Sequence, residues 1–433
     1  MIVHASDINT CSLPPIESST LSTYARSRNI MIGTLINECF NPSFSETNRT
    51  ICKQLITKEY ANLRLSYQNP WSSMEKTQGT VDYSKLDEVI AFAKSINSTI
   101  QFYHLIWTNH GRYTNPPAWV FPNRSNTSCG TRTKNELKSI MKMHIQDMIK
   151  HGGNTVKVWN VVNEAFDKHG DLVQDCFYKI IGPDYLDKAF QYAREVSPQA
   201  ILVLNDFFHD IRPGNQKVDG FIQFVKNAKQ RGVPIDAVGV QNHLWKNDID
   251  YFGPDYKTDI QSFMDKAKNA GVKVIITEMD VYQKTQSQED VKRVYKDVTS
   301  ICLTHTNCLG ISTWGTSDKY SWLRGLDPIF IPSTPDPQPL LFDENYARKP
   351  AYFGVMEAIR ENTTRPCVPI PPNPADLVDT GDTSGDQVNQ YDANQLKADF
   401  GKTGVAGWIK ADINDDGRVD IFDYNELVEN FGT

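Results

Sequence analysis

The sequence predicts an α/β protein with a (β/α)8 barrel, a linker and a small α-helical module of the EF-hand type. Three observations predict this arrangement. Eight short apolar runs alternate with helix-like stretches, a segment rich in Pro, Gly, Asp and Thr follows them, and the last segment carries a repeated motif beside an Asp-rich loop. We place the barrel at residues 20–362, the linker at 363–385 and the module at 386–433.

Composition limits the class of protein. A chain of 433 residues with 39% hydrophobic and 22% charged residues is typical of a soluble globular protein with a sizeable core. The net charge of -7 argues against binding to nucleic acid or to an anionic membrane surface. The same charge balance favours a neutral substrate. Since no run of 18 apolar residues occurs, we expect no membrane span.

The barrel prediction depends on the spacing of the strands. The eight predicted strands are residues 29–36, 61–66, 99–107, 155–164, 201–207, 237–244, 272–281 and 310–315. Amphipathic helices are predicted between them, for example at 83–97, 184–197 and 218–232, the last of which ends in a glycine. In such a barrel the active site forms at the carboxyl ends of the strands.

Six successive predicted strands end in polar or aromatic side chains. They are His104 and Trp107, Asn163 and Glu164, Asn205 and Asp206, Gln241 and His243, Glu278 and Asp280, and Trp314. Any one of these side chains could serve only to cap or solvate a loop. As a set on one rim of a barrel they indicate an active site.

Two of these side chains predict the chemistry. Glu164 ends the fourth strand and Glu278 ends the seventh, so the two carboxylates face each other across the barrel mouth. A pair of carboxylates is what cleavage of a glycosidic bond requires. A separation of about 5 to 5.5 Å gives retention of configuration and about 6.5 to 9.5 Å gives inversion. The sequence leaves that separation open.

The neighbours of the two carboxylates suggest their roles. Glu278 and Asp280 point to the same face of their strand, and Gln241 and His243 have the same spacing on the adjacent strand. A chain of contacts from Asp280 through His243 would keep Glu278 ionised, as a nucleophile requires. The alternative is that Asp280 and His243 form an ordinary buried pair. Glu164 follows an apolar strand, which favours a raised pKa and a general acid.

Aromatic residues and cysteines add two further indications. Trp71, Trp107, Trp314 and Trp322 follow or end strands, which favours a carbohydrate cleft on this rim. The eight cysteines include no CxxC motif, which argues against a zinc or redox site. Cys302 and Cys308 can close a short loop as a disulfide, and such a bond would place the protein outside the cytosol. The pairing of the other six cysteines stays open.

Residues 29–362 resemble glycoside hydrolase family 10, the endo-1,4-β-xylanases. The resemblance runs through VWNVVNEAF, VPIDAVGVQNHL, VIITEMDV, CLGISTWGTSDKYSWL and PLLFDENYARKPAYFGV. It implies xylan as substrate, no cofactor for catalysis and a retaining mechanism, with Glu164 as acid/base and Glu278 as nucleophile. It also implies that Asn163 bonds the sugar 2-hydroxyl, that Gln241 and His243 line the reacting subsite, that Trp314 and Trp322 form its wall, and that Cys302 and Cys308 form a disulfide.

The first half of the barrel departs from the family pattern. After the second strand, Glu-Asn-x-Met-Lys-Trp is replaced by SYQNPW at 66–71, in which only the Trp is kept. After the third strand, His-Thr-Leu-Val-Trp-His becomes YHLIWT, so Tyr103 and Thr108 align with the two histidines. His104 replaces the first histidine only if the strand slips by one residue. These changes leave open another β-1,4-glycan, xylo-oligosaccharides, or a non-hydrolytic polysaccharide-binding protein.

The C-terminal segment predicts a calcium site. Residues 412–423 match a 12-residue calcium loop with the turn at Gly417. The predicted ligands are Asp412, Asn414, Asp416, the carbonyl of Arg418, Asp420 and Asp423. With the paired copy at 388–401, the segment resembles a dockerin type I module, which implies a cohesin-like partner. The alternative is a calcium-bound cap on its own linker. In the first copy, Gly381, Thr383 and Gly385 take the early ligand positions, so we expect no ion there.

Together these observations predict a secreted, extracellular, retaining endo-β-1,4-xylanase. We expect calcium only in the C-terminal module, and partners limited to the polysaccharide substrate and a cohesin-like protein.

Overall fold

The computed structural model describes residues 13–65, 71–107, 116–121, 129–245, 249–283, 286–325 and 336–366. All of them belong to the first of the two units into which the chain divides, residues 1–368. Most of the predicted linker and the whole C-terminal module, with the proposed calcium ligands, lie outside the described residues.

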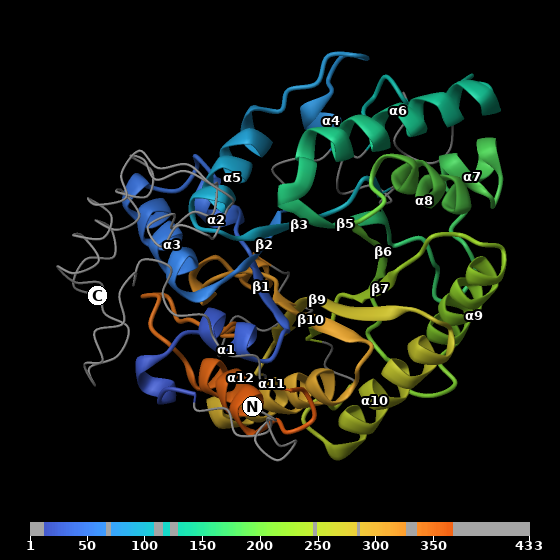
Figure 1. Ribbon diagram of the computed structural model, residues 1–433. Coiled ribbons are helices and arrows are strands. Elements are labelled where there is room, and N and C mark those ends of the chain that lie inside the picture. The colour runs from blue at the N-terminus through green and yellow to red at the C-terminus, as the bar shows by residue number, and fades with distance from the viewer. Residues whose placement is uncertain are drawn as a thin grey trace, which may run out of the picture. The chain divides into compact units, whose positions relative to one another are not determined.

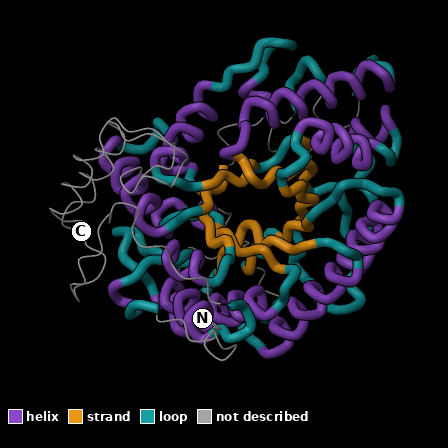
Figure 2. Tube along the Cα trace, in the orientation of Figure 1, coloured by secondary structure: helices purple, strands orange, loops and turns teal. Residues whose placement is uncertain are grey.

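Eight parallel strands close into a barrel. They are β1 (Met31–Leu35), β2 (Asn62–Leu65), β3 (Thr99–Phe102), β5 (Val156–Asn163), β6 (Ile201–Asp206), β7 (Ala237–Val240), β9 (Lys273–Val281) and β10 (Cys308–Thr313). Because β10 pairs with both β1 and β9, the sheet has no free edge at this point, and the strands form a closed ring (Figure 2). Two short strands, β4 (Ile106–Trp107) and β8 (His243–Leu244), add to β5 and β9.

Helices follow each barrel strand and surround the ring (Figure 1). The longer ones are α3 (Glu46–Glu59), α5 (Ser84–Ser95), α6 (Lys134–Gly152), α8 (Tyr185–Val196), α9 (Gln216–Gln230), α10 (Pro254–Asn269), α11 (Gln288–Thr304) and α12 (Pro350–Glu361). Shorter helical segments are η1 (Ile16–Ser18), α1 (Leu21–Ser27), α2 (Asn37–Phe40), α4 (Trp71–Met74), η2 (Gly153–Thr155), α7 (Cys176–Ile181), η3 (Asp318–Tyr320) and η4 (Trp322–Gly325). The alternation of strand and helix confirms the barrel prediction.

Local sequence signals explain where several helices begin and end. Helix α6 begins with a capping box in which the Thr133 side chain accepts from the backbone of Glu136 and the Glu136 side chain accepts from the backbone of Thr133. After α9 the chain turns at Gly232, whose φ of 77° favours glycine. These signals fix the helix boundaries that bring each following strand back to the barrel.

Two predicted strands are interrupted near their carboxyl ends. The predicted strand 99–107 divides into β3 and β4, and the predicted strand 237–244 divides into β7 and β8. In the second case Asn242 has a φ of 62°, a left-handed conformation that does not continue a strand. Strand β10 also begins two residues earlier than predicted, at Cys308.

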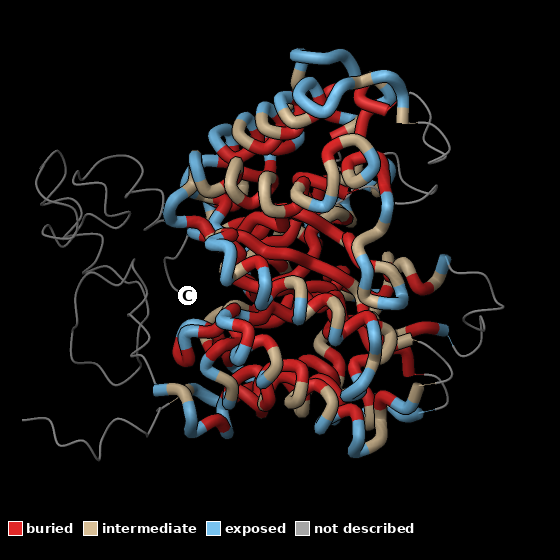
Figure 3. The backbone as a smooth tube through the Cα atoms, turned by 90° about the vertical axis from the view of Figure 1, so that its right-hand side faces the viewer, coloured by how far each residue is buried: buried red, intermediate tan, exposed pale blue. Residues whose placement is uncertain are grey.

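Apolar side chains form part of the barrel interior, and the exterior of the barrel packs against the helices. Inside, Val158, Val203, Ala237 and Ile275 form one cluster contributed by four strands. A larger cluster fills the space between strands and helices, so the buried residues run through the centre of the molecule (Figure 3). Among the described helices, none is long and apolar enough to cross a membrane.

Three disulfides link described residues. Cys302 and Cys308 are bonded, as predicted, and join the end of α11 to the start of β10. The other two bonds, Cys39–Cys52 and Cys129–Cys176, join partners whose pairing the sequence left open.

Candidate active site

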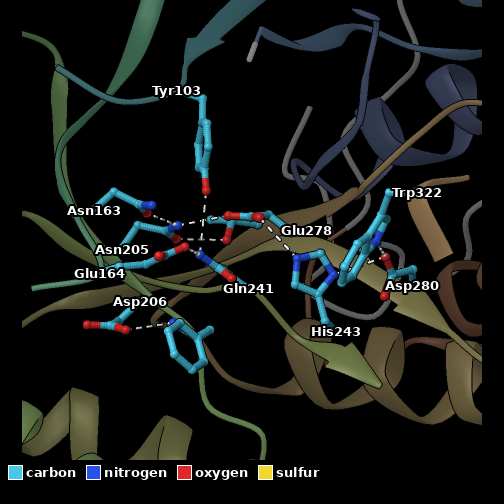
Figure 4. A network of polar contacts seen from close by, with 12 residues as sticks. Tyr103, Asn163, Glu164, Asn205, Asp206, Gln241, His243, Glu278, Asp280 and Trp322 are labelled. Carbon is cyan, nitrogen blue, oxygen red and sulfur yellow. Dashed lines mark hydrogen bonds and ion pairs between the residues drawn. The ribbon is translucent and has the colours of Figure 1, made fainter. Parts of the chain in front are cut away.

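Glu164 lies directly after β5, at the mouth of the barrel. Its φ of 52° is rare for a residue other than glycine, and its backbone N–H donates to the carbonyl of Asn205 at 2.9 Å. Gln241 donates from Nε2 to Oε1 of Glu164 at 2.8 Å, and Trp107 donates from Nε1 to Oε2 at 3.0 Å. Both carboxylate oxygens are therefore held by neutral donors, and Figure 4 shows Gln241 beside Glu164.

Burial gives Glu164 the character of an acid. Burial raises its pKa to about 7, and the negative charges of Asp206 and Glu278 add to this effect. The hydrogen bonds from Gln241 and Trp107 lower the pKa but do not cancel the rise. Near neutral pH a large fraction of Glu164 therefore carries the proton that a general acid must donate.

Glu278 lies in β9 in a different electrostatic setting. The residue is only 1% exposed, and Asn205 donates from Nδ2 to its Oε1 at 2.9 Å. The guanidinium of Arg64 approaches the same oxygen at 3.3 Å, and His243 Nε2 lies 3.2 Å from Oε2. Two cationic groups and one amide donor are thus directed at the Glu278 carboxylate, an arrangement that suits a nucleophile.

His243 connects Glu278 to Asp280. Its Nδ1 lies 3.0 Å from Oδ2 of Asp280, and Trp322 donates to the same oxygen at 2.6 Å. Burial lowers the pKa of His243, but Asp280 and Glu278 outweigh burial and raise it to about 10. The imidazole is thus charged at neutral pH and donates from both nitrogens. The predicted chain of contacts from Asp280 through His243 to Glu278 is present (Figure 4).

Asn205 links Glu278 to Asn163. Its Nδ2 donates both to Oε1 of Glu278 and to Oδ1 of Asn163 at 2.8 Å, while its Oδ1 accepts from Thr277 at 2.8 Å. The Nδ2 of Asn163 is buried and has no partner among the described residues. Asn163 therefore keeps a donor that a sugar hydroxyl can use, which agrees with the role implied by the family resemblance.

Asp206, next to Asn205, serves the structure around the site. Its two oxygens accept from the backbone N–H of Phe166 at 3.1 Å and from Lys217 at 2.7 Å. These contacts tie the segment after Glu164 to β6 and α9. Asp206 therefore supports the position of Glu164.

Three of the four predicted tryptophans lie at the site. Trp107 bonds Glu164, Trp322 bonds Asp280, and Trp314 packs with its ring centre 5.9 Å from that of His243. Trp71 differs from the expectation, because the residue is only 2% exposed and its ring stacks on His144 with the ring centres 3.8 Å apart. The face covered by His144 is not available to a sugar, so the contacts of Trp71 indicate packing.

The register after β3 places Tyr103 at the site. Gln241, which bonds Glu164, also donates to the Tyr103 hydroxyl at 3.5 Å. His104 is buried between the rings of Tyr103 and Trp107, and burial lowers its pKa to about 3, so it is neutral. The chain does not slip to bring His104 toward the carboxylates. Thr108 and residues 66–70 lie outside the described part.

A cavity of about 1220 Å³ opens beside Glu164. Trp107 and Glu164 border it, and aromatic rings such as Phe166, Tyr178 and Phe207 line it further along. Apolar rings and scattered polar groups are the usual lining of a ligand cleft. The cavity therefore offers room for part of a ligand beside Glu164.

Arg64 is the site residue that the sequence analysis missed. It is fully buried in β2 and forms an ion pair with Glu278. The signal was its position, since a charged residue between Leu63 and Leu65 in an apolar strand needs a buried partner. Within the described ranges, no cluster of three His, Cys, Asp or Glu side chains is suited to a metal ion.

Comparisons with known proteins agree with this geometry. Residues 20–358 match the model of glycosyl hydrolase family 10. Endo-1,4-beta-xylanase B of Thermotoga neapolitana is 30% identical over 318 residues, 71% of this chain and 83% of that protein. An endo-1,4-beta-xylanase of Agaricus bisporus is 28% identical over 305 residues, 70% of this chain and 84% of that protein. The crystal structure of native xylanase 10B from Thermotoga maritima superposes with a TM-score of 0.68 and 28% identity, covering 79% of this chain and 98% of that chain.

Proposed function

Because this chain belongs to glycosyl hydrolase family 10, we propose that it is a retaining endo-β-1,4-xylanase that cleaves internal bonds of xylan. The observation that carries this proposal is the contrast between two carboxylates at one rim of the barrel. Glu164 has a pKa raised to about 7, whereas Glu278 is surrounded by Arg64, His243 and Asn205. Such a contrast assigns one group as acid and the other as nucleophile.

The first step forms a glycosyl-enzyme. Glu278 attacks the anomeric carbon and forms a bond to it, while the bond from that carbon to the leaving oxygen breaks. Glu164 gives its proton to the leaving oxygen, and the cavity beside Glu164 holds the departing part of the chain. Glu164 is then an anion.

The second step releases the sugar. Glu164, now a base, removes a proton from a water molecule, and the water oxygen bonds the anomeric carbon. The bond between that carbon and Glu278 breaks, so Glu278 regains its negative charge beside Arg64 and His243. Two inversions at one carbon give net retention of configuration.

Xylan is favoured as the substrate by the relatives, which are named as endo-1,4-beta-xylanases. The second candidate is the same chemistry on another β-1,4-glycan or on xylo-oligosaccharides. Tyr103 motivates it, because the family pattern has a histidine at this position beside Gln241. A binding protein without activity is disfavoured by the hydrogen-bonded settings of both Glu164 and Glu278.

The test compares xylan, mixed β-glucan and mannan as substrates of the wild type and of Glu278→Gln. Release of reducing sugar from xylan that disappears in the variant supports the proposal, and an initial product with the β configuration by NMR supports retention. Preference for β-glucan or mannan would move the assignment to the second candidate. Binding of xylan without release of sugar from any of the three would overturn the enzymatic function.

We also propose that the protein is secreted. The support is chemical, because Cys39–Cys52, Cys129–Cys176 and Cys302–Cys308 are bonds that persist in an oxidising compartment. The expected result is that the native chain is found in the culture medium and that its disulfide-bonded cysteines do not react with an alkylating reagent. A reduced chain found inside cells would contradict the proposal.

We propose further that the C-terminal module binds calcium and attaches the enzyme to a cohesin-like partner. The sequence supports this, because the oxygen donors of Asp412, Asn414 and Asp416 suit a hard cation. Calorimetric titration of the full chain with Ca²⁺ should show one site that Asp412→Ala removes, whereas unchanged binding would contradict the loop assignment. Calcium-dependent capture by a purified cohesin would support attachment, and capture equal in a chelator would not.

A further inference from the structure

Arg64 occupies an unusual position for a cation. Its side chain is fully buried in β2, inside the barrel rather than at its surface. Its guanidinium carbon lies 4.7 Å from the ring centre of Tyr103 and 5.6 Å from that of Trp314. The faces of two aromatic rings thus hold the guanidinium beside the reacting carboxylate.

Glu278 is the counter-ion of Arg64. Among the described residues, Glu278 is the only carboxylate within ion-pair distance of the guanidinium, at 3.3 Å from Nη2. The Nε and Nη1 atoms of Arg64 are buried and have no hydrogen-bond partner in the same part of the chain. The charge of Arg64 is therefore directed to one partner, and losing that partner leaves an uncompensated buried cation.

We propose that Arg64 is a positioning residue for the nucleophile, which orients the Glu278 carboxylate and favours its departure from the glycosyl-enzyme. The proposal rests on the double displacement proposed above. In the glycosyl-enzyme Glu278 is an ester without a full negative charge, so Arg64 loses its counter-ion. When water displaces the ester, the carboxylate charge returns and the ion pair forms again, which lowers the barrier of the second step.

Other charged groups surround the pair, and they do not replace Arg64. His243 from β8 contacts the second oxygen of Glu278, and its charge is shared with Asp280 of β9. The charge of Glu164, after β5, interacts with that of Glu278, and the ring of Tyr103, after β3, lies against the Arg64 guanidinium. Because His243 already serves two carboxylates, Arg64 is the cation directed to Glu278 alone within the described residues.

The kinetic test uses the full chain with Arg64→Met and Arg64→Lys, on 2,4-dinitrophenyl β-xylobioside. This leaving group needs no proton, so the second step limits turnover. We expect Arg64→Met to lower kcat at least about tenfold and to lower KM with it, because the glycosyl-enzyme accumulates. Arg64→Lys should recover most of kcat, since it keeps the charge. Equal losses of kcat and kcat/KM without accumulation, or an unchanged kcat, would overturn the proposal.

A second measurement tests the ion pair without using activity. Thermal unfolding is compared for the wild type, Arg64→Met, Glu278→Gln and the double variant. We expect Glu278→Gln to lower Tm and the added Arg64→Met to restore part of the loss, because the second change removes the unpaired buried cation. Additive Tm losses would overturn the pairing. If the wild type cleaves no glycoside while the Tm values are coupled, the proposed function fails and the ion pair stands.

Discussion

Trp107 donates a hydrogen bond from its indole nitrogen to Oε2 of Glu164 at 3.0 Å. This contact opposes burial, because it lowers the pKa of Glu164, which burial raises to about 7. The pKa of Glu164 therefore depends on two effects of opposite sign, burial and the hydrogen bond from Trp107. The ionisation of Glu164 then determines the pH above which the first step slows.

Replacing Trp107 with Phe should move that limit upward. Loss of the indole donor removes an interaction that favours the carboxylate, so the pKa of Glu164 rises above about 7. Since the first step requires the protonated acid, kcat/KM on xylan should persist to higher pH, whatever the absolute rate. The pH profiles of both proteins give the measurement. Trp119→Phe is the control, because that indole donates to the Glu75 carbonyl, and a shift in both variants would contradict the assignment.

Glutamine at the two carboxylates should separate their roles. Glu164→Gln should lose about 10²- to 10⁴-fold in turnover of xylan, whose leaving oxygen needs a proton. On 2,4-dinitrophenyl β-xylobioside it should form the glycosyl-enzyme at a rate close to that of the wild type. Glu278→Gln should lose both reactions, because it lacks the nucleophile. Pre-steady-state release of dinitrophenolate measures this step, and a burst from Glu278→Gln would reverse the assignment.

Sequence reasoning predicted the barrel because strand and helix alternation is a local property. It located Glu164, Glu278, His243 and Asp280 because parallel strands of a barrel end on one rim. It missed Arg64, since the partner of a buried charge lies across the barrel and not nearby in sequence.

Two other features could not be predicted from the sequence, because they also depend on contacts between residues far apart in the chain. The burial of Trp71 follows from its packing on His144 of α6, far along the chain. Cys129 and Cys176 are 47 residues apart in the sequence, and only the fold brings the two cysteines together. Position in a strand can be predicted locally, whereas contacts between distant elements need the structure.

The charge on His243 should make stability depend on pH. Its pKa is raised in the folded protein from 6.5 to about 10, chiefly because Asp280 outweighs burial. The stabilisation is fully present below pH 6.5 and is lost as pH rises through about 10. The Tm difference between the wild type and His243→Asn should therefore shrink from pH 6.5 to 10.

Thermal unfolding across this range measures the effect. His151→Asn is the control, because its partner Asp87 is exposed and such surface pairs contribute little. Parallel Tm curves for the wild type and His243→Asn would show that the imidazole is not charged in the folded protein.

A methyl group at Gly239 should disturb catalysis through Asn205. An added Cβ would contact Oδ1 of Asn205 and lie 2.9 Å from its Cγ and 3.0 Å from Cγ2 of Thr277. Because these atoms belong to buried strands, the Asn205 amide must move and weaken its hydrogen bond to Glu278.

For Gly239→Ala we expect kcat on xylan to fall roughly 10²-fold, as for a misplacement of about 1 Å in a reacting group. The free energy of unfolding should fall by about 1–3 kcal/mol from overpacking. Gly325→Ala is the matched control, since a Cβ there meets no atom of the described residues within 4 Å. If Gly239→Ala keeps full activity while losing stability, the nucleophile tolerates displacement of Asn205, and its orientation depends on Arg64 and His243 instead.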